Sequence, residues 1–222
     1  MYEMEKKKLI EFAVRVFREQ MVQGTGGNLS IVTSKEKGHF IITPSGMPYE
    51  SLQVSDIVVI DFEGNIVEGN RKPSIEKDMH RLIYINRPDI DALMHTHAVH
   101  STAISITHKP LPQIESTIVF LGGDIECADY ARHGSMDLAN NAVKALGKRG
   151  AVLLANHGLI VVADTLETCY EQTVAIEQCA KMYIYASAVG TPIPITDEKC
   201  DDLRNYASES YGQGDSTGAT SV

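Results

Sequence analysis

The sequence contains no tryptophan, only 6% aromatic residues, and no run of Lys and Arg longer than Lys6–Lys8. Its 222 residues include 20 Lys and Arg against 29 Asp and Glu, so the formal charge is −9. A nucleic-acid partner needs a dense basic face, and this balance argues against one. An anionic ligand is still compatible with it, because backbone N–H groups, hydroxyl groups or a metal can hold a phosphate.

Long hydrophobic runs are also missing. The first 21 residues place Leu9, Phe12 and Val16 at helical spacing but interrupt them with charges, so they predict neither a signal peptide nor a membrane span. We therefore expect no membrane partner. The four cysteines form no CxxC pair, and two of them fall on predicted buried helix faces. Free thiols and a reduced, cytoplasmic setting are expected.

Strand and helix patterns alternate irregularly along the chain. Strands are predicted at residues 29–33, 39–43, 56–60, 92–97, 151–155 and 159–163, and helices at 1–21, 73–86, 135–146 and 164–188. Ser74 is the expected N-cap of the second helix, and Asp164 with Glu167 predicts a capping box for the last. We expect α/β layers around a mixed, largely antiparallel sheet, in one domain spanning residues 1–211 with a flexible tail at 212–222.

Three histidines stand at predicted strand ends. Residues i and i+2 of a strand point to the same side, so His95 and His97 can reach one ion. An HxH pair alone also fits an exposed strand face or buried core histidines. His157 strengthens the metal interpretation, because it lies between an apolar strand and Gly158, and three imidazoles with one carboxylate complete a zinc sphere. The other candidates, expected to have structural or supporting roles, are His80, His100, His108 and His133.

Glu76 falls in the first turn of the second predicted helix. The helix dipole alone favours an acidic residue there. However, Ser74 and the free N–H groups of a helix start can also bind a phosphate, which would place a carboxylate beside the substrate. The turn at residues 24–28 is a second possible phosphate cradle, although it matches neither a P-loop nor GxGxxG.

Five motifs, in order and spacing, resemble the class II aldolase/adducin family. They are Gly26-Gly27-Asn28-Leu29-Ser30, Thr43-Pro44-Ser45-Gly46, Pro73-Ser74-x-Glu76, His95-Thr96-His97 and Asn156-His157-Gly158-Leu159. The similarity covers residues 5–195 and is closest to the L-fuculose-1-phosphate aldolase branch. It implies a three-layer α/β/α sandwich and a ring-like homotetramer with active sites at the subunit interfaces.

The resemblance also implies roles for individual residues. The zinc ligands would be His95, His97 and His157, with Glu76 a fourth ligand at rest and the acid/base in turnover. The substrate phosphate would be held by Asn28, Ser45, Gly46 and Ser74, with Thr25 a lesser contributor. Manganese, cobalt or iron would fit the same ligands as zinc.

The implied reaction is cleavage of a ketose 1-phosphate, such as L-fuculose 1-phosphate or a related 5-deoxy or pentulose 1-phosphate. The products are dihydroxyacetone phosphate and an aldehyde, formed by way of a metal-stabilised enediolate. Ile75 replaces a second serine of that branch, and Ser116 stands where the branch has an interface tyrosine. Candidates for the aldehyde side are Glu115, His133 and Tyr211.

Other reactions of the family remain open. The same metal site supports sugar-phosphate epimerisation, decarboxylation, and dehydration of methylthioribulose phosphate. A non-catalytic, adducin-like binding module is the alternative from another class. That role does not require the HxH pair, His157 and Glu76 together.

Overall fold

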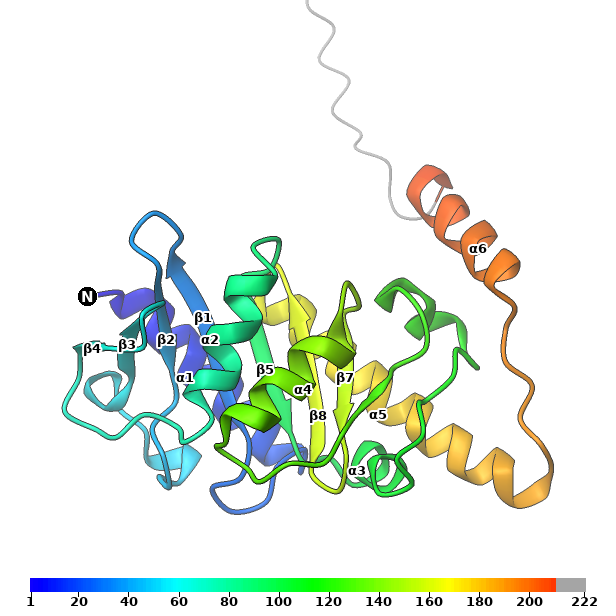
Figure 1. Ribbon diagram of the computed structural model, residues 1–222, viewed down its shortest axis with the longest axis horizontal. Helices are drawn as coiled ribbons and strands as arrows, with labels where there is room; N and C mark the ends of the chain where they lie inside the picture. The colour runs from blue at the N-terminus through cyan, green and yellow to red at the C-terminus, as the bar shows by residue number, and fades with distance from the viewer. Residues whose placement is uncertain (211–222) are drawn as a thin grey trace, which may run out of the picture.

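The computed structural model describes residues 1–210, and one eight-stranded sheet organises them (Figure 1). The strands are β1 Asn28–Ser34, β2 His39–Ile42, β3 Val58–Asp61, β4 Ile66–Glu68, β5 Ala92–Thr96, β6 Cys127–Ala128, β7 Ala151–Leu154 and β8 Gly158–Ala163. Their order is β4-β3-β2-β1-β5-β8-β7-β6. Every neighbouring pair is antiparallel except β6 and β7, so the predicted mixed, largely antiparallel sheet is confirmed.

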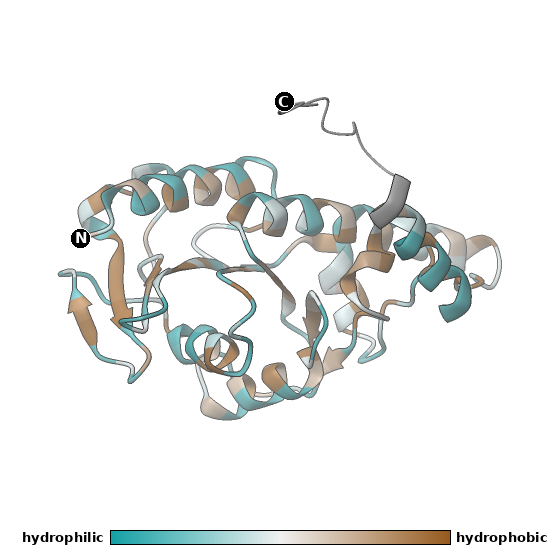
Figure 2. Ribbon diagram, turned by 90° about the horizontal axis from the view of Figure 1, so that it is seen from above, coloured by the Kyte–Doolittle hydropathy of each residue, from teal (hydrophilic) through white to brown (hydrophobic). Residues whose placement is uncertain are grey.

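Helices cover both faces of the sheet, which gives the three layers seen in Figure 2. The helices are α1 Glu3–Arg18, α2 Lys77–Asn86, α3 Val99–Ser105, α4 Met136–Leu146, α5 Leu166–Val189 and α6 Asp197–Ser210. One apolar core packs the sheet against α1, α3 and α5, and a second packs it against α2 and α4. Alternation along β5 serves both cores, because Met94 joins the first and Leu93 the second.

The position of β5 in the sheet determines where the functional side chains gather. It pairs with β1 so that His95 lies opposite Asn28, and with β8 so that Thr96 lies opposite Leu159. The end of β5, the start of β1 and the turn between β7 and β8 therefore meet at one edge of the sheet, the lower edge in Figure 1.

The second helix begins later than predicted. It starts at Lys77, and Glu76 rather than Ser74 occupies its N-cap position. The backbone N–H of Ser74 donates to the Thr43 carbonyl at 3.1 Å, and that of Ser45 donates to the Lys72 carbonyl at 2.9 Å. Pairing between these two segments holds residues 72–74 in an extended conformation, which overrides the local capping signal.

The cap of α5 also differs from the prediction. Thr165 is the N-cap, and its side chain accepts a hydrogen bond from the Thr168 N–H at 3.1 Å. The predicted capping box of Asp164 and Glu167 is therefore wrong, because the N-cap is the next residue, Thr165. The helix at 135–146 does begin as predicted, with Ser135 as the N-cap of α4.

Several elements lie outside the predicted ranges. They are the short strands β4 and β6, the helices α3 and α6, and the 3-10 helices (η1 Tyr49–Ser51, η2 Val54–Asp56 and η3 Ser116–Leu121). The fully buried Cys200 and a 2.6 Å hydrogen bond from Arg204 to the Val119 carbonyl tie α6 to η3. All four cysteines are free thiols, as expected. Over residues 1–210, no helix has both the length and the apolar character needed to cross a membrane.

Candidate active site

Three imidazole rings converge at the sheet edge. His95 lies in the fully buried strand β5, His97 follows that strand, and His157 comes from the turn between β7 and β8. The Nε2 atom of His95 lies 3.0 Å from that of His97 and 3.3 Å from that of His157. The structure thus brings together the predicted HxH pair and a histidine about sixty residues further along the chain.

His95 presents a nitrogen lone pair to the other two rings. His95 Nδ1 lies 3.0 Å from the Leu159 carbonyl, which can only accept, so Nδ1 carries the hydrogen and Nε2 is left unprotonated. Burial lowers the pKa of His95 and His97, and it lowers the pKa of His157 to about 4. All three rings are therefore neutral near pH 7, and each can offer one nitrogen lone pair to a cation.

Glu76 brings a carboxylate to the same point. Its Oε2 lies 3.3 Å from His95 Nε2, and its Oε1 lies 3.5 Å from His157 Nε2. Burial raises the pKa of this carboxyl, but His95, His157 and the amide of Asn28 outweigh burial and leave the pKa below its ordinary value. Glu76 is thus ionised, and its buried Oε1 has no hydrogen-bond partner.

This arrangement fits a bound divalent cation. A buried, unpaired acceptor is costly, and here the ionised carboxylate of Glu76 faces the lone pair on His95 Nε2, and its Oε1 has no hydrogen-bond partner. Zinc–nitrogen bonds of about 2.0–2.1 Å in a tetrahedral site place neighbouring nitrogens about 3.3 Å apart, close to the separations seen here. The ligand atoms of His95, His97 and His157 lie within 4.8 Å of one another. Three imidazoles and a carboxylate suit zinc, and manganese, cobalt or iron use the same donors.

Glycines allow the backbone to approach these rings. A Cβ on Gly26 would lie 2.9 Å from His97 Nδ1, and one on Gly158 would lie 3.3 Å from His95 Cε1. Gly27 has a φ of +73°, and a Cβ there would lie 2.6 Å from the His95 carbonyl oxygen. The glycine-rich turn therefore packs directly on the histidine strand, which is a reason for glycine that does not depend on phosphate binding.

A cavity of about 390 Å³ opens beside the cluster. All five residues predicted to bind phosphate line it, together with catalytic candidates: Thr25, Asn28, Ser45, Gly46 and Ser74 with Glu76, His97 and His157. Among the described residues, its lining contains no Lys or Arg. An anion in this cavity would be held by hydroxyl groups, amide N–H groups and the metal.

The three residues predicted for the aldehyde side differ in their position relative to the cavity. His133 lines the cavity beside Ile75, whose side chain is 57% exposed. Glu115 is not part of the lining; its carboxylate caps η3 and accepts hydrogen bonds from Ser116 and Thr117. Tyr211 lies outside the described residues.

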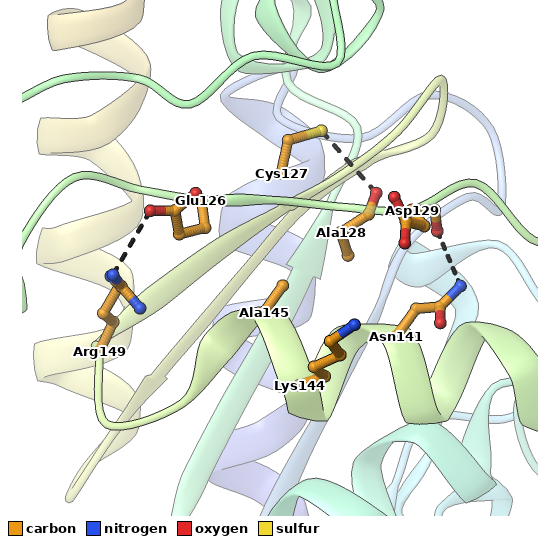
Figure 3. Close-up of a pocket in the computed structure, with 8 residues that line it drawn as sticks. All are labelled: Glu126, Cys127, Ala128, Asp129, Asn141, Lys144, Ala145 and Arg149. Atoms are coloured by element: carbon orange, nitrogen blue, oxygen red, sulfur yellow. Dashed lines mark hydrogen bonds and ion pairs between the residues drawn. The ribbon is translucent and has the colours of Figure 1, made fainter.

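A second cavity, of about 330 Å³, lies between β6 and α4 (Figure 3). Arg149 pairs there with Glu126 at 3.4 Å, and Asn141 donates to the backbone carbonyl of Asp129 at 3.1 Å. No buried carboxylate with three histidines converges there among the residues drawn. The first cavity is therefore the candidate for metal and acid/base chemistry.

Comparison with known proteins agrees with this site. Residues 7–184 match the family described as Class II Aldolase and Adducin N-terminal domain. The chain belongs to this family. The resemblance recognised from five motifs is thereby confirmed, and so is the α/β fold expected from it.

Individual proteins that are similar to this chain bear the names of sugar-phosphate aldolases. A 5-deoxy-D-ribulose 1-phosphate aldolase of Bacillus thuringiensis is 35% identical over 94% of this chain and 97% of its own. An L-fuculose phosphate aldolase of Escherichia coli strain K12 is 38% identical over 87% of this chain and 88% of its own. A solved L-fuculose 1-phosphate aldolase superposes with a TM-score of 0.88 at 39% identity, covering 91% of this chain and 95% of that one. The protein is therefore an enzyme of the class II aldolase family.

Proposed function

We propose that this enzyme is a zinc-dependent lyase that cleaves a ketose 1-phosphate to dihydroxyacetone phosphate and an aldehyde. The observation that carries the proposal is the convergence of three neutral imidazoles on the ionised Glu76 at the wall of an open cavity. His95, His97 and His157 would hold the cation, with Glu76 as its fourth ligand before substrate arrives. When bound there, a divalent cation supplies Lewis-acid stabilisation of developing negative charge, worth several kcal/mol.

Glu76 would act as the acid/base. Breaking the bond between C3 and C4 turns the C4 hydroxyl into the aldehyde carbonyl with loss of its proton, and it leaves a carbanion at C3 that must take up a proton to become dihydroxyacetone phosphate. The ionised Glu76 would accept the first proton and deliver it to C3. Oε1 has no hydrogen-bond partner, while Oε2 is held by the Asn28 amide at 2.8 Å, so Oε1 is the oxygen available to carry that proton. General acid/base catalysis of this kind contributes about 10² to 10⁴ in rate.

The phosphate would bind on the opposite side of the cavity from the histidines. Ser45, Gly46 and Ser74 belong to two loops that hydrogen-bond to each other through backbone groups. The hydroxyl groups of Ser45, Ser74 and Thr25, the N–H of Gly46 and the amide of Asn28 would orient C3 toward Glu76. Because no basic side chain of the described residues lines the cavity, affinity would depend on this fixed set of donors.

We propose that the aldehyde released is less polar than lactaldehyde. Ile75 is an exposed apolar side chain in the cavity wall, where the fuculose branch has serine. The relative aligned over 97% of its length bears the name of a 5-deoxyribulose 1-phosphate aldolase. A 5-deoxypentulose 1-phosphate is thus favoured over L-fuculose 1-phosphate, and a methylthio relative is the next candidate.

The remaining proposals concern assembly and setting. We propose a cytoplasmic homotetramer of single-domain subunits, residues 1–211 each, whose active sites lie at subunit interfaces. Glu115, which lies outside the cavity lining of its own chain, would then reach the aldehyde side only from a neighbouring subunit. Analytical ultracentrifugation should give the mass of four chains, and a monomer retaining full activity would contradict this arrangement.

A substrate panel tests the reaction. Zinc-loaded enzyme is incubated with 5-deoxyribulose, L-fuculose, L-ribulose and methylthioribulose 1-phosphates, and dihydroxyacetone phosphate is measured by coupling to glycerol-phosphate dehydrogenase. We expect the product with at least one ketose 1-phosphate. A product that keeps the carbon chain intact would instead indicate an epimerase or a dehydratase, and release of CO₂ a decarboxylase. An inert protein without stoichiometric metal would indicate the adducin-like binding role.

A further inference from the structure

A chain of buried polar side chains runs from the active-site carboxylate into the α2 face of the sheet. Asn28 Nδ2 donates to Glu76 Oε2 at 2.8 Å, and His80 Nε2 lies 2.5 Å from Asn28 Oδ1. Ser30 Oγ lies 2.6 Å from both His80 Nδ1 and Tyr84 Oη. None of these residues is more than 5% exposed. The sequence pattern gave His80 only a general supporting role.

Chemistry fixes the direction of every hydrogen bond in this chain. The ionised Glu76 only accepts, so Asn28 must turn its NH₂ group toward it and its oxygen toward His80. That oxygen in turn requires a hydrogen on His80 Nε2, because burial keeps the ring neutral with a pKa of about 3. His80 Nδ1 must then accept from Ser30, whose own oxygen accepts from Tyr84.

We infer that His80 is a positioning residue that acts on catalysis through Asn28. By donating to Asn28 Oδ1, it locks the amide with NH₂ toward Glu76, and this anchors Oε2 while Oε1 stays free to face the metal and the substrate. The inference rests on the proposed role of Glu76. Supporting groups of this kind typically change metal affinity or activity by about 10–100-fold when removed.

Loss of the His80 donor would release Asn28. Its Oδ1 would then be buried without a partner, which is unfavourable enough to make the side chain rotate away. Glu76 would lose its anchor on Oε2, and both its acid/base geometry and its contribution to the metal site would loosen. His80→Gln can still place an amide N–H near the position of Nε2, whereas His80→Leu cannot donate at all.

The test compares these two variants in the wild-type background and in the Asn28→Ala background. Thermal unfolding establishes that each protein folds, zinc affinity is measured by competition with a chromogenic chelator, and kcat and KM are measured separately. His80→Leu should lower kcat and zinc affinity by about 10–100-fold with a much smaller change in KM, and His80→Gln should retain most of both. If His80→Leu does not fold, Ser30→Ala replaces it, since it removes the hydrogen that keeps the His80 proton on Nε2.

Coupling between the two positions decides the outcome. If His80 acts through Asn28, the loss caused by His80→Leu largely disappears in the Asn28→Ala background. Losses that multiply independently, or equal kcat and zinc affinity in the Leu and Gln variants, would overturn the inference. Should the wild-type enzyme cleave no ketose phosphate, the proposed reaction fails, while the zinc affinities still test the role of His80.

Discussion

The two oxygens of Glu76 have different surroundings. Oε2 accepts a hydrogen bond from Asn28, while Oε1 is buried without a partner and faces His157. One oxygen is therefore held by Asn28, and the other has no hydrogen-bond partner. Under the proposed function, this difference would let one side chain act first as a metal ligand and then as an acid/base.

Replacing Glu76 by glutamine tests the acid/base role. Glu76→Gln keeps the size of the side chain and an oxygen ligand but removes the group that carries the proton. We expect kcat to fall about 10²- to 10⁴-fold, while the protein still binds one zinc ion through its three histidines. Steady-state kinetics and elemental analysis measure the two effects. Glu126→Gln, a surface change outside this cavity, serves as the control, and equal kcat in both variants would contradict the role.

At the scale of residues, short-range patterns predicted more than long-range ones. The HxH pair follows from the two-residue period of a strand, and His157 from its place between an apolar strand and a glycine. The roles of Asn28 and His80 toward Glu76 depend on contacts between residues about fifty positions apart. No local pattern encodes these contacts, so Asn28 was assigned to phosphate alone.

Among the elements, the glycine-rich turn before β1 is the most constrained. Gly24 and Gly27 both have positive φ, but a Cβ on Gly24 would meet nothing within 4 Å. A Cβ on Gly27 would lie 2.6 Å from both the His95 carbonyl oxygen and Val22 Cγ1. A substitution at Gly24 therefore tests backbone strain alone, whereas one at Gly27 tests strain together with close packing against the histidine strand.

This pair gives a matched prediction for stability. Gly24→Ala should cost about 1–2 kcal/mol in unfolding free energy from left-handed strain alone. Gly27→Ala should cost that amount and a further ~1–3 kcal/mol, because β1 and β5 must move apart. Urea unfolding measures both changes. Equal losses in the two variants would show that the close approach to His95 does not matter.

Helix starts were the least predictable elements. A serine before an acidic residue reads locally as a cap, but residues 72–74 pair with the Thr43–Ser45 loop and a turn follows at 75–76, so the helix begins only at Lys77. Asp164 and Thr165 are adjacent and both suit an N-cap, so only the backbone conformation determines which of them is the cap. The amphipathic helices and the strands were predictable, because each element buries apolar residues against the sheet or the helices, and this burial produces a regular spacing of apolar residues in the sequence.

The cap of α5 can be tested directly. Thr165→Ala removes the oxygen that accepts from the Thr168 N–H, so it should lower the unfolding free energy by about 1 kcal/mol. Asp164→Ala removes a side chain that makes no such cap and should change stability far less. Thermal or urea unfolding compares the two variants. A larger loss in Asp164→Ala would restore the capping box expected from the sequence.

For the whole molecule, metal and fold are linked through the sheet edge. The proposed ligands come from β5 and the residue after it, from the β7–β8 turn and from the segment before α2, so a bound ion would connect three parts of the chain. A ligand that binds only the folded state stabilises it by about 4 kcal/mol at 1,000 times its Kd. The three-layer fold was predictable from the family motifs, whereas α6 and η3 were not, since their docking depends on contacts far apart in sequence.

Metal removal should therefore lower stability and abolish activity together. Treatment with a chelator is expected to decrease the Tm and stop turnover, and added zinc should restore both. His157→Ala should show little zinc-dependent change in Tm, which ties the effect to the histidine cluster. A Tm of the wild-type protein that does not respond to chelator or zinc would contradict the link.

The most direct measurement is anomalous X-ray diffraction from zinc-loaded crystals, recorded above and below the zinc absorption edge. We predict one strong peak per chain, about 2.0–2.1 Å from the Nε2 atoms of His95, His97 and His157. A fully occupied zinc ion elsewhere, with these three rings unliganded, would contradict the account.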